Sequence, residues 1–197
     1  MLKIGITGGM GSGKTTVCRV FEVLGIPVFY ADDAAKSLMN TDLLLKQNII
    51  HGFGVNSYSE KGELNRKYIS SLVFNNKQEL LKLNAMVHPA VFQAFDGWVL
   101  KQKAAPYVIK EAALLFESDS HKMCDQSVLV KSTDALRIQR IIKRDITTQE
   151  EVKLRMNRQF SDERKEEMAD HVILNDEQNL IIPQVLDLHQ QFLKMTV

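Results

Sequence analysis

The feature that most constrains this chain is a glycine-rich stretch near its start, GITGGMGSGKTTV at residues 5–17. An apolar run at residues 2–7 leads into it, and a segment with apolar residues at helical spacing follows it. From Gly8 to Thr15 the stretch fits the pattern G-x-x-x-x-G-K-[ST]. A strand, a glycine loop and a helix in this order predict the opening of an α/β fold. The alternative is a glycine-rich turn that fits the pattern by chance.

The chemistry of such a loop favours phosphate. Glycines allow consecutive backbone N–H groups to turn inward around phosphate oxygens, and the helix that follows points its positive dipole end at the same anion. The residues expected to hold a nucleotide are Gly8, Gly9, Gly11, Ser12, Gly13, Lys14, Thr15 and Thr16. Lys14 would reach the β- and γ-phosphates, and the Thr15 hydroxyl would hold Mg²⁺. The pattern therefore indicates a nucleotide-binding P-loop.

The rest of the chain alternates apolar stretches with helical segments. Four compact apolar stretches rich in β-branched residues follow the first, at residues 26–30, 105–112, 125–132 and 170–175. Strands that alternate with helices are typical of a parallel sheet. We predict a three-layer α/β fold of the P-loop NTPase type, with a five-stranded parallel sheet.

Two connections are longer than a single crossover between strands requires. Residues 33–104 contain helical runs and no convincing strand, so we predict a helical substrate-binding insertion there. Residues 145–168 are almost entirely polar and helical, which fits either a mobile lid or an ordinary solvated surface. The expected organisation is one domain over residues 1–197, with its core at about 1–32, 105–145 and 169–197.

Composition narrows the choice of partners and compartment. The 25 basic and 24 acidic residues leave a net charge of +1, which gives no argument for a nucleic-acid or membrane-surface partner. Cys18 and Cys124 lack the spacing of a zinc site or of a disulfide framework. The mean hydropathy is −0.15, and no apolar run reaches the roughly 18 residues of a membrane span. We expect a cytoplasmic protein, and the oligomeric state stays open.

A P-loop leaves the reaction open, and two classes can be compared. A GTPase would carry D-x-x-G, yet no aspartate here has a glycine three residues later, and NNKQE at 75–79 is better interpreted as a helix start. A small-molecule kinase needs a carboxylate near the acceptor hydroxyl. Asp32 follows the second predicted strand, at the edge where ligands of open α/β sheets bind. The alternative is that Asp32 or Asp33 caps the next helix.

Three arginines recur at three- and four-residue spacing in ALRIQRIIKRD. Arg137, Arg140 and Arg144 therefore share one side of a helix. Cations without interleaved acids repel each other unless an anion compensates, which suits a phosphate clamp. The alternative is an amphipathic helix with a basic solvent face.

Taken together, these segments resemble the dephospho-coenzyme A kinase family. The resemblance runs almost end to end and rests on IGITGGMGSGKTTV, GIPVFYADDAAKSL, LNAMVHPAV, ALLFES, QRIIKRD, LRMNRQ and ADHVILN. The P-loop alone is unspecific, but the combination in this order and spacing is highly specific.

The resemblance implies transfer of the γ-phosphoryl group of ATP to the 3′-hydroxyl of dephospho-coenzyme A, with Mg²⁺, as the last step of coenzyme A synthesis in a single kinase domain. By matching positions, Asp32 would accept the hydroxyl proton and Lys14 would stabilise the transferring group. Arg140, joined by Arg144, would close with the lid onto the phosphates. His88 would contact the substrate, although a histidine before proline can also set a helix entrance. No nucleic acid or membrane is implied as a partner.

The chain departs from the family pattern at several positions. Tyr30 stands where the family often has the first aspartate of D-A-D, and Lys36 replaces a frequent histidine. Glu111 and Ala113 replace an aspartate and a proline. Glu111 could orient a magnesium-bound water, or it could be a paired carboxylate without catalytic work. Two other functions stay open: another P-loop kinase that acts on a nucleoside, a sugar acid or shikimate, and a nucleotide-binding module that transfers nothing.

Overall fold

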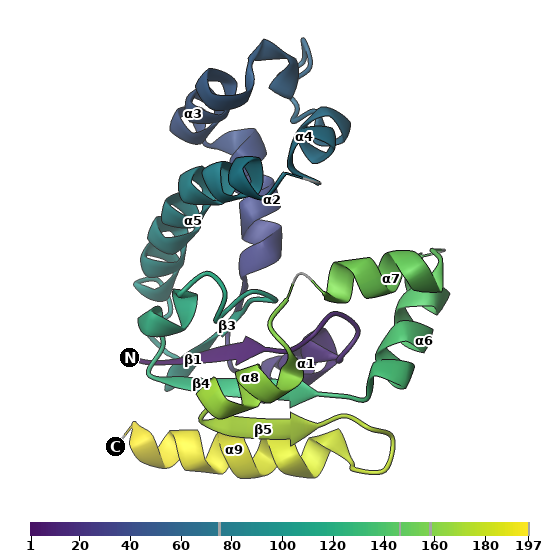
Figure 1. Ribbon diagram of the computed structural model, residues 1–197. Helices are drawn as coiled ribbons and strands as arrows, with labels where there is room; N and C mark the ends of the chain where they lie inside the picture. The colour runs from purple at the N-terminus through teal and green to yellow at the C-terminus, as the bar shows by residue number, and fades with distance from the viewer. Residues whose placement is uncertain (75, 146, 158, 197) are drawn as a thin grey trace. The chain divides into compact units, whose positions relative to one another are not determined.

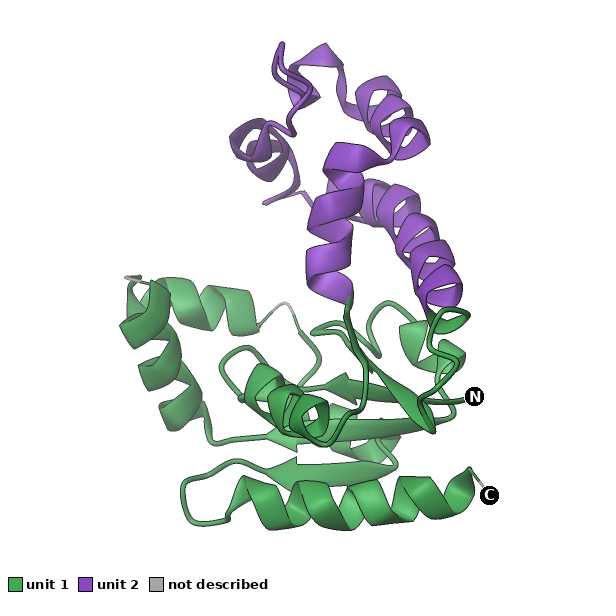
Figure 2. Cartoon of the chain, turned by 180° about the vertical axis from the view of Figure 1, so that it is seen from behind, with its two compact units in different colours: residues 1–30, 99–197 green, residues 31–98 purple. Residues whose placement is uncertain are grey.

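The chain divides into two compact units (Figure 2). The computed structural model describes residues 1–74, 76–145, 147–157 and 159–196. Unit 1 comprises residues 1–30 and 99–197, and unit 2 comprises residues 31–98. The expected insertion began at residue 33, whereas the second unit takes in Asp32 because helix α2 starts at Ala31, directly after a strand.

Unit 1 is built on a sheet of five parallel strands (Figure 1). The strands are β1 (Leu2–Thr7), β2 (Val28–Tyr30), β3 (Tyr107–Glu111), β4 (Gln126–Lys131) and β5 (His171–Leu174). Their order in the sheet is β2-β3-β1-β4-β5, so β1 is central and lies between β3 and β4. The predicted five-stranded parallel sheet is confirmed. All five strands end at the same edge, because they are parallel, and the P-loop leaves β1 there.

Helices cover both faces of this sheet. These are α1 (Lys14–Val23) and α9 (Ile181–Met195) on one face and α8 (Asp162–Met168) on the other. Two further helices, α6 (Asp134–Asp145) and α7 (Gln149–Met156), pack on each other beyond the end of β4 (Figure 1), and a short 3₁₀ turn lies at Ser120–Met123. On one face, Phe21 of α1 and Phe192 of α9 pack edge-to-face on Tyr107 of β3, with ring centroids 6.5 and 5.6 Å apart. On the other face, Lys131 of β4 reaches Glu166 of α8 at 2.6 Å. The predicted three-layer architecture follows from this alternation.

The regular elements of unit 2 among its described residues are helices, joined by loops, with one isolated bridge between Tyr58 and Leu64. Its helices are α2 (Ala31–Thr41), α3 (Leu43–Phe53), α4 (Arg66–Val73) and α5 (Lys77–Val99), with a 3₁₀ turn at Val55–Ser57. The start of α5 is stabilised by Asn76, whose side chain accepts from the backbone N–H groups of Gln78 and Glu79. The NNKQE stretch is thus a helix start, although Asn75 lies outside the described residues.

Side chains that bond to distant backbone hold unit 2 together. The Tyr58 hydroxyl donates to the Met39 carbonyl at 2.7 Å, and the Tyr68 hydroxyl donates to the Phe53 carbonyl at 3.0 Å. Lys82 Nζ donates to the Gly52 carbonyl at 2.6 Å.

Among the described residues of the whole chain, no helix is both long and apolar enough to cross a membrane.

Candidate active site

The P-loop connects β1 to α1 and has the backbone conformation that its glycines predict. Gly11 and Gly13 have φ angles of 79° and 94°, a region that other residues rarely adopt. Gly13 is the N-cap of α1, and its position provides no side-chain hydrogen bond to the helix. A helix start that lacks such a cap leaves its N–H groups available to an anion.

Other segments of the same chain pack closely against the outside of the P-loop. A Cβ on Gly13 would lie 2.1 Å from Asn175 Nδ2, and a Cβ on Gly8 would lie 2.3 Å from the Val130 carbonyl oxygen. Asn175 Nδ2 donates to the Ser12 carbonyl at 2.7 Å. The Ser12 hydroxyl is itself buried and has no hydrogen-bond partner. The loop is thus a tight cradle that only glycine fits, with one polar group unsatisfied, and this supports phosphate as its ligand.

Lys14 lies inside the loop. Its side chain is buried, and Nζ donates to the Gly8 carbonyl at 3.0 Å and to the Gly9 carbonyl at 3.4 Å. Glu111 Oε1 lies 4.0 Å from the same ammonium group. Glu111 is the last residue of β3 and is also buried. The structure therefore brings the predicted lysine and Glu111 together at the edge of the sheet where the P-loop opens.

The residues proposed for metal and acceptor chemistry are exposed. Thr15 and Thr16 lie in the first turn of α1 with exposed side chains. Asp32 and Asp33 lie in the first turn of α2, so neither is the N-cap considered above. Asp33 forms an ion pair with Lys36 at 2.7 Å. Asp32 belongs to unit 2, whereas Lys14 belongs to unit 1.

Tyr30 does not replace the carboxylate that the family pattern has at its position. Burial raises the pKa of the Tyr30 hydroxyl, and the charges of Cys18 and Glu22 and a hydrogen bond with Glu22 raise it further. Burial also raises the pKa of the Cys18 thiol, with the charge of Glu111 adding to the effect. Both groups are therefore protonated near neutral pH. Tyr30 therefore supplies no anionic oxygen that would hold Mg²⁺, and Cys18 supplies no thiolate beside it.

The three arginines of α6 have different surroundings. Arg137 is buried, and its Nε donates to the Met10 carbonyl of the P-loop at 3.0 Å. Arg140 is half-buried and donates to the Asn175 carbonyl at 3.3 Å and to the Ser132 hydroxyl at 3.2 Å. Arg144 is exposed and pairs with Asp145, its neighbour in sequence, at 2.6 Å. The helix thus presents one arginine to the P-loop, one to the chain after β5 and one to solvent.

His88 lies in the middle of α5, which continues through Pro89. It is therefore not at a helix entrance. Its ring stacks on that of Phe92, with centroids 6.1 Å apart and an interplanar angle of 25°. The side chain is half-buried.

A cavity of about 470 Å³ lies between the end of β4, the start of α6 and the chain between α7 and α8. Its polar lining includes Arg137, Gln159 and Asp162.

Among the described residues, no group of three or more His, Cys, Asp or Glu side chains could hold a metal ion. A metal ion at the P-loop would depend on oxygen atoms of a bound nucleotide together with the exposed Thr15 hydroxyl. Mg²⁺ is commonly held by few protein ligands and by substrate phosphates in this way.

Comparison with known proteins decides the family. The family model described as dephospho-CoA kinase matches residues 2–180. The chain belongs to the dephospho-CoA kinase family. A curated dephospho-CoA kinase from Salinibacter ruber is 41% identical over 180 residues, which are 89% of this chain and 89% of that protein.

Solved structures agree with the dephospho-CoA kinase assignment at the level of the fold. The crystal structure of TT1252 from Thermus thermophilus matches with a TM-score of 0.83 and 29% identity, over 96% of each chain. A dephospho-CoA kinase from Campylobacter jejuni matches with a TM-score of 0.70 and 23% identity, over 99% of this chain and 98% of that one.

Sequence reasoning about this member of the dephospho-CoA kinase family missed three polar residues that contact or support the P-loop. Asn175 and Gln159 are the last residues of two motifs quoted above, ADHVILN and LRMNRQ, to which no role was given. Arg158, in the second motif, lies outside the described residues. Asp162 pairs with Arg137 at 3.1 Å. For Asn175 and Gln159, the position at the end of a motif was the available signal, but the partners of all three residues are distant in sequence.

Proposed function

We propose that this chain transfers the γ-phosphoryl group of ATP to the ribose 3′-hydroxyl of dephospho-coenzyme A, which yields coenzyme A and ADP. The observation that carries the proposal is the glycine cradle with Lys14 buried inside it, in a chain that belongs to the dephospho-CoA kinase family. The loop would supply backbone N–H groups and the Lys14 ammonium group to the phosphate groups of ATP. Such chemistry consists mainly of positioning and charge neutralisation.

Lys14 is proposed to act on the transferring group. Its present bonds to the Gly8 and Gly9 carbonyls hold the ammonium group within the loop. A bound triphosphate offers stronger, charge-assisted acceptors at the same place, so the ammonium would exchange the carbonyls for phosphate oxygens. The backbone N–H groups of Gly11 to Thr16 would hold the remaining phosphate oxygens, in line with the positive end of α1.

We propose a Mg²⁺ site at the Thr15 hydroxyl. When bound, the ion would neutralise negative charge on the phosphate groups during transfer. Thr15 is exposed at the start of α1, and the N-cap residue Gly13 has no side chain that could block access to it. Glu111, buried beside Lys14, is placed to hold the ammonium group in its position by charge.

Asp32 is proposed as the group that receives the proton of the acceptor hydroxyl. It lies in the first turn of α2, where the positive end of the helix dipole stabilises a carboxylate. Its side chain is exposed, whereas its neighbour Asp33 is already paired with Lys36. Asp32 is therefore the freer of the two carboxylates for contact with a substrate.

Arg140 and Arg144 are proposed to bind phosphate as the chain around α7 closes. Hydrogen bonds of Arg140 to Asn175 and Ser132 are 3.2 to 3.5 Å long and go to neutral acceptors, so they are weaker than bonds to an anionic phosphate. We further propose that residues 145–168 form the lid and that the helical unit, residues 31–98, holds the coenzyme, with His88 as a substrate contact. Positions 146 and 158 of the lid lie outside the described residues.

A coupled ADP-release assay tests the reaction. Mg-ATP is supplied with dephospho-coenzyme A and, in parallel, with adenosine, gluconate or shikimate, and the product is weighed by mass spectrometry. We expect saturable release with dephospho-coenzyme A alone and a product heavier by one phosphate group. Turnover with a smaller acceptor instead would assign a different kinase reaction. ATP binding without turnover on any acceptor would indicate a binding module.

A further inference from the structure

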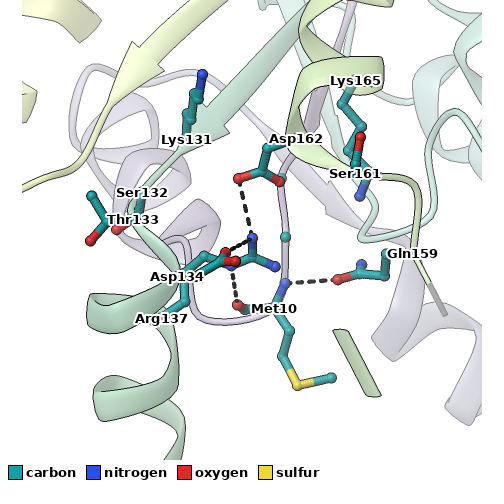
Figure 3. A network of polar contacts seen from close by, with 12 residues as sticks. Met10, Lys131, Ser132, Thr133, Asp134, Arg137, Gln159, Ser161, Asp162 and Lys165 are labelled. Atoms are coloured by element: carbon teal, nitrogen blue, oxygen red, sulfur yellow. Dashed lines mark hydrogen bonds and ion pairs between the residues drawn. The ribbon is translucent and has the colours of Figure 1, made fainter. Parts of the chain in front are cut away.

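The tip of the P-loop is bound from outside by two side chains that the proposed chemistry does not use. The Met10 N–H donates to Gln159 Oε1 at 2.9 Å, and the Met10 carbonyl accepts from Arg137 Nε at 3.0 Å (Figure 3). Both polar groups of this one residue are thus satisfied by residues far away in the sequence. A loop of glycines has little stiffness of its own. These two bonds are therefore a means of fixing the loop.

Arg137 is bound to the protein through the Nε and Nη1 atoms of its guanidinium group. Its Nη1 lies 3.0 Å from Asp134 Oδ1 and 3.1 Å from Asp162 Oδ2, while Nε bonds to Met10. The guanidinium group also lies directly against Gly9, where an added Cβ would be 2.0 Å from Nη2. Its charge is therefore balanced by two carboxylates. Such an arginine shapes the loop rather than binding phosphate itself.

The two carboxylates differ in burial, although they bind the same nitrogen atom. The side chain of Asp134 is 73% exposed, and that of Asp162 is 10% exposed. Burial raises the pKa of Asp162, and the charge of Arg137 opposes that rise. Water screens the exposed pair, whereas breaking the buried pair leaves a charge without compensation. Asp162 is therefore the partner that holds the guanidinium in place.

The chain that carries Asp162 is itself anchored. Gln159 Nε2 donates to the Ala113 carbonyl, just beyond β3, at 3.1 Å. The next residue, Phe160, donates its N–H to Glu117 Oε1 at 2.8 Å. Lys165 of α8 is fully buried and pairs with the same oxygen at 3.1 Å. Residues 159–165 thus form a rigid support, although they lie within the stretch whose composition fitted a mobile lid.

We infer that Arg137, held by Asp162 and joined by Gln159, is a positioning residue that keeps the P-loop tip in the conformation that receives the nucleotide. The inference rests on the proposed function, because the ligand of the loop is taken to be ATP. It makes nucleotide affinity depend on the connection between α7 and α8. Loss of the support leaves the phosphate-binding N–H groups in place along the chain but no longer pre-organised, so nucleotide binding has to order them.

The test is a calorimetric titration with ADP, which needs no acceptor and no turnover. A hydrogen bond that involves a charged group contributes about 1.5–3 kcal/mol, so Arg137→Ala should weaken ADP binding by about ten- to a hundredfold. Asp162→Asn should approach this loss, and the double variant should bind no worse than Arg137→Ala, because the two residues act as one unit. Asp134→Asn is the matched control and should bind ADP within about twofold of the parent.

Two further readouts separate positioning from stability alone. In amide hydrogen exchange without nucleotide, Met10 should exchange faster in Arg137→Ala and in Arg137→Gln, which serves if the alanine variant folds poorly. The KM for dephospho-coenzyme A should stay unchanged while the KM for ATP rises. A lower melting temperature with unchanged ADP affinity would overturn the inference. Additive losses for Arg137→Ala and Asp162→Asn would overturn it too, because they would show that the two residues act independently.

The design keeps this inference separate from the proposed reaction. If dephospho-coenzyme A is not the acceptor, the ADP titrations still report on the P-loop. If the ADP titrations show no effect of Arg137, the transfer reaction can still be observed in the coupled assay. Each failure is therefore visible by itself.

Discussion

The two units of this chain bury different kinds of side chain. The buried charged residues among those described all lie in unit 1 and are Lys14, Lys110, Glu111, Arg137 and Lys165. In unit 2 the buried residues are apolar except for Ser57. Burial of a charge is costly unless the charge is paired and hydrogen-bonded. Unit 1 includes such buried charges among its described residues, whereas unit 2 does not.

This difference indicates that chemistry determines which residues are buried in unit 1, whereas packing determines which are buried in unit 2. Lys14 and Glu111 lie at the carboxyl edge of the sheet, and Arg137 lies against the P-loop that leaves the same edge. Charged groups with fixed geometry in a dry site interact strongly with developing charge. Asp32 of unit 2, the group proposed to act on the acceptor hydroxyl, is exposed. Substitutions of the buried charges of unit 1 should therefore have the larger effects on catalysis.

The largest expected effect comes from Lys14. We expect Lys14→Ala to lower kcat by about 10²- to 10³-fold, the typical loss when one preorganised group that stabilises transition-state charge is removed. Steady-state rates with saturating dephospho-coenzyme A measure it. Arg19→Ala, on the exposed side of the same helix, is the control and should retain the parent rate. A normal rate in Lys14→Ala would remove the link between buried charge and chemistry.

Asp32 should have the next largest effect, from unit 2. We expect Asp32→Asn to lower kcat by about 10²-fold, since a general base contributes roughly this factor or more and the transition state of phosphoryl transfer is loose. ATP binding should stay largely intact, as measured by calorimetry. Asp33→Asn is the matched control, because Asp33 is the adjacent carboxylate and is paired with Lys36.

The result for Asp32 sharpens the comparison in either direction. Loss of ATP binding without unfolding would show that this carboxylate serves the nucleotide or the metal rather than the acceptor hydroxyl. An unchanged rate would assign all of the chemistry to unit 1.

The fold was largely predictable, because local pattern and fold agree. Five apolar stretches became five strands, and the glycine pattern became a loop between β1 and α1. The helical character of residues 31–98 was predictable from its periodicity. The length of α5 was not, because Pro89 normally interrupts a helix and tertiary packing overrides it here.

The candidate site was predictable only where partners are near in sequence or belong to one motif. The P-loop glycines and Lys14 form such a motif. Arg137 was expected to share a phosphate clamp with Arg140 and Arg144, yet its partners include Asp162 and Met10, which lie 25 and 127 positions away. Helical spacing shows which residues share a face but not what lies opposite. Asn175 and Gln159 were missed for the same reason.

The third prediction compares two ion pairs of α8. Lys165 is fully buried and pairs with Glu117 at 3.1 Å, whereas Glu166 pairs with Lys131 at 2.6 Å in contact with water. Removal of one partner from a buried pair leaves an uncompensated charge, so Lys165→Met should lower the free energy of unfolding by about 3 kcal/mol. Urea denaturation measures it.

Glu166→Gln is the control for the buried pair. Because its partner is exposed and screened, it should cost at most about 1 kcal/mol. Equal losses for the two variants would show that burial does not decide the strength of these ion pairs. That outcome would also weaken the argument made above for Asp162 over Asp134.

The smallest expected effect concerns His189, a polar group of unit 1 that lies far from the P-loop in sequence. Its Nδ1 lies 2.6 Å from the hydroxyl of Tyr107, a fully buried residue. Burial lowers the pKa of His189 below its usual 6.5 and raises that of Tyr107, so a protonated phenol faces a neutral imidazole near neutral pH. Below pH 6.5 the unfolded chain binds the proton more readily than the folded chain does. The free energy of unfolding should therefore fall as the pH drops from 7 through 6.5, and it should level off below the lowered pKa.

His189→Gln keeps an acceptor for Tyr107 but cannot titrate, so in urea denaturation at several pH values it should lose less stability over this range than the parent. Parallel curves for the two proteins would show that this pair does not couple folding to protonation.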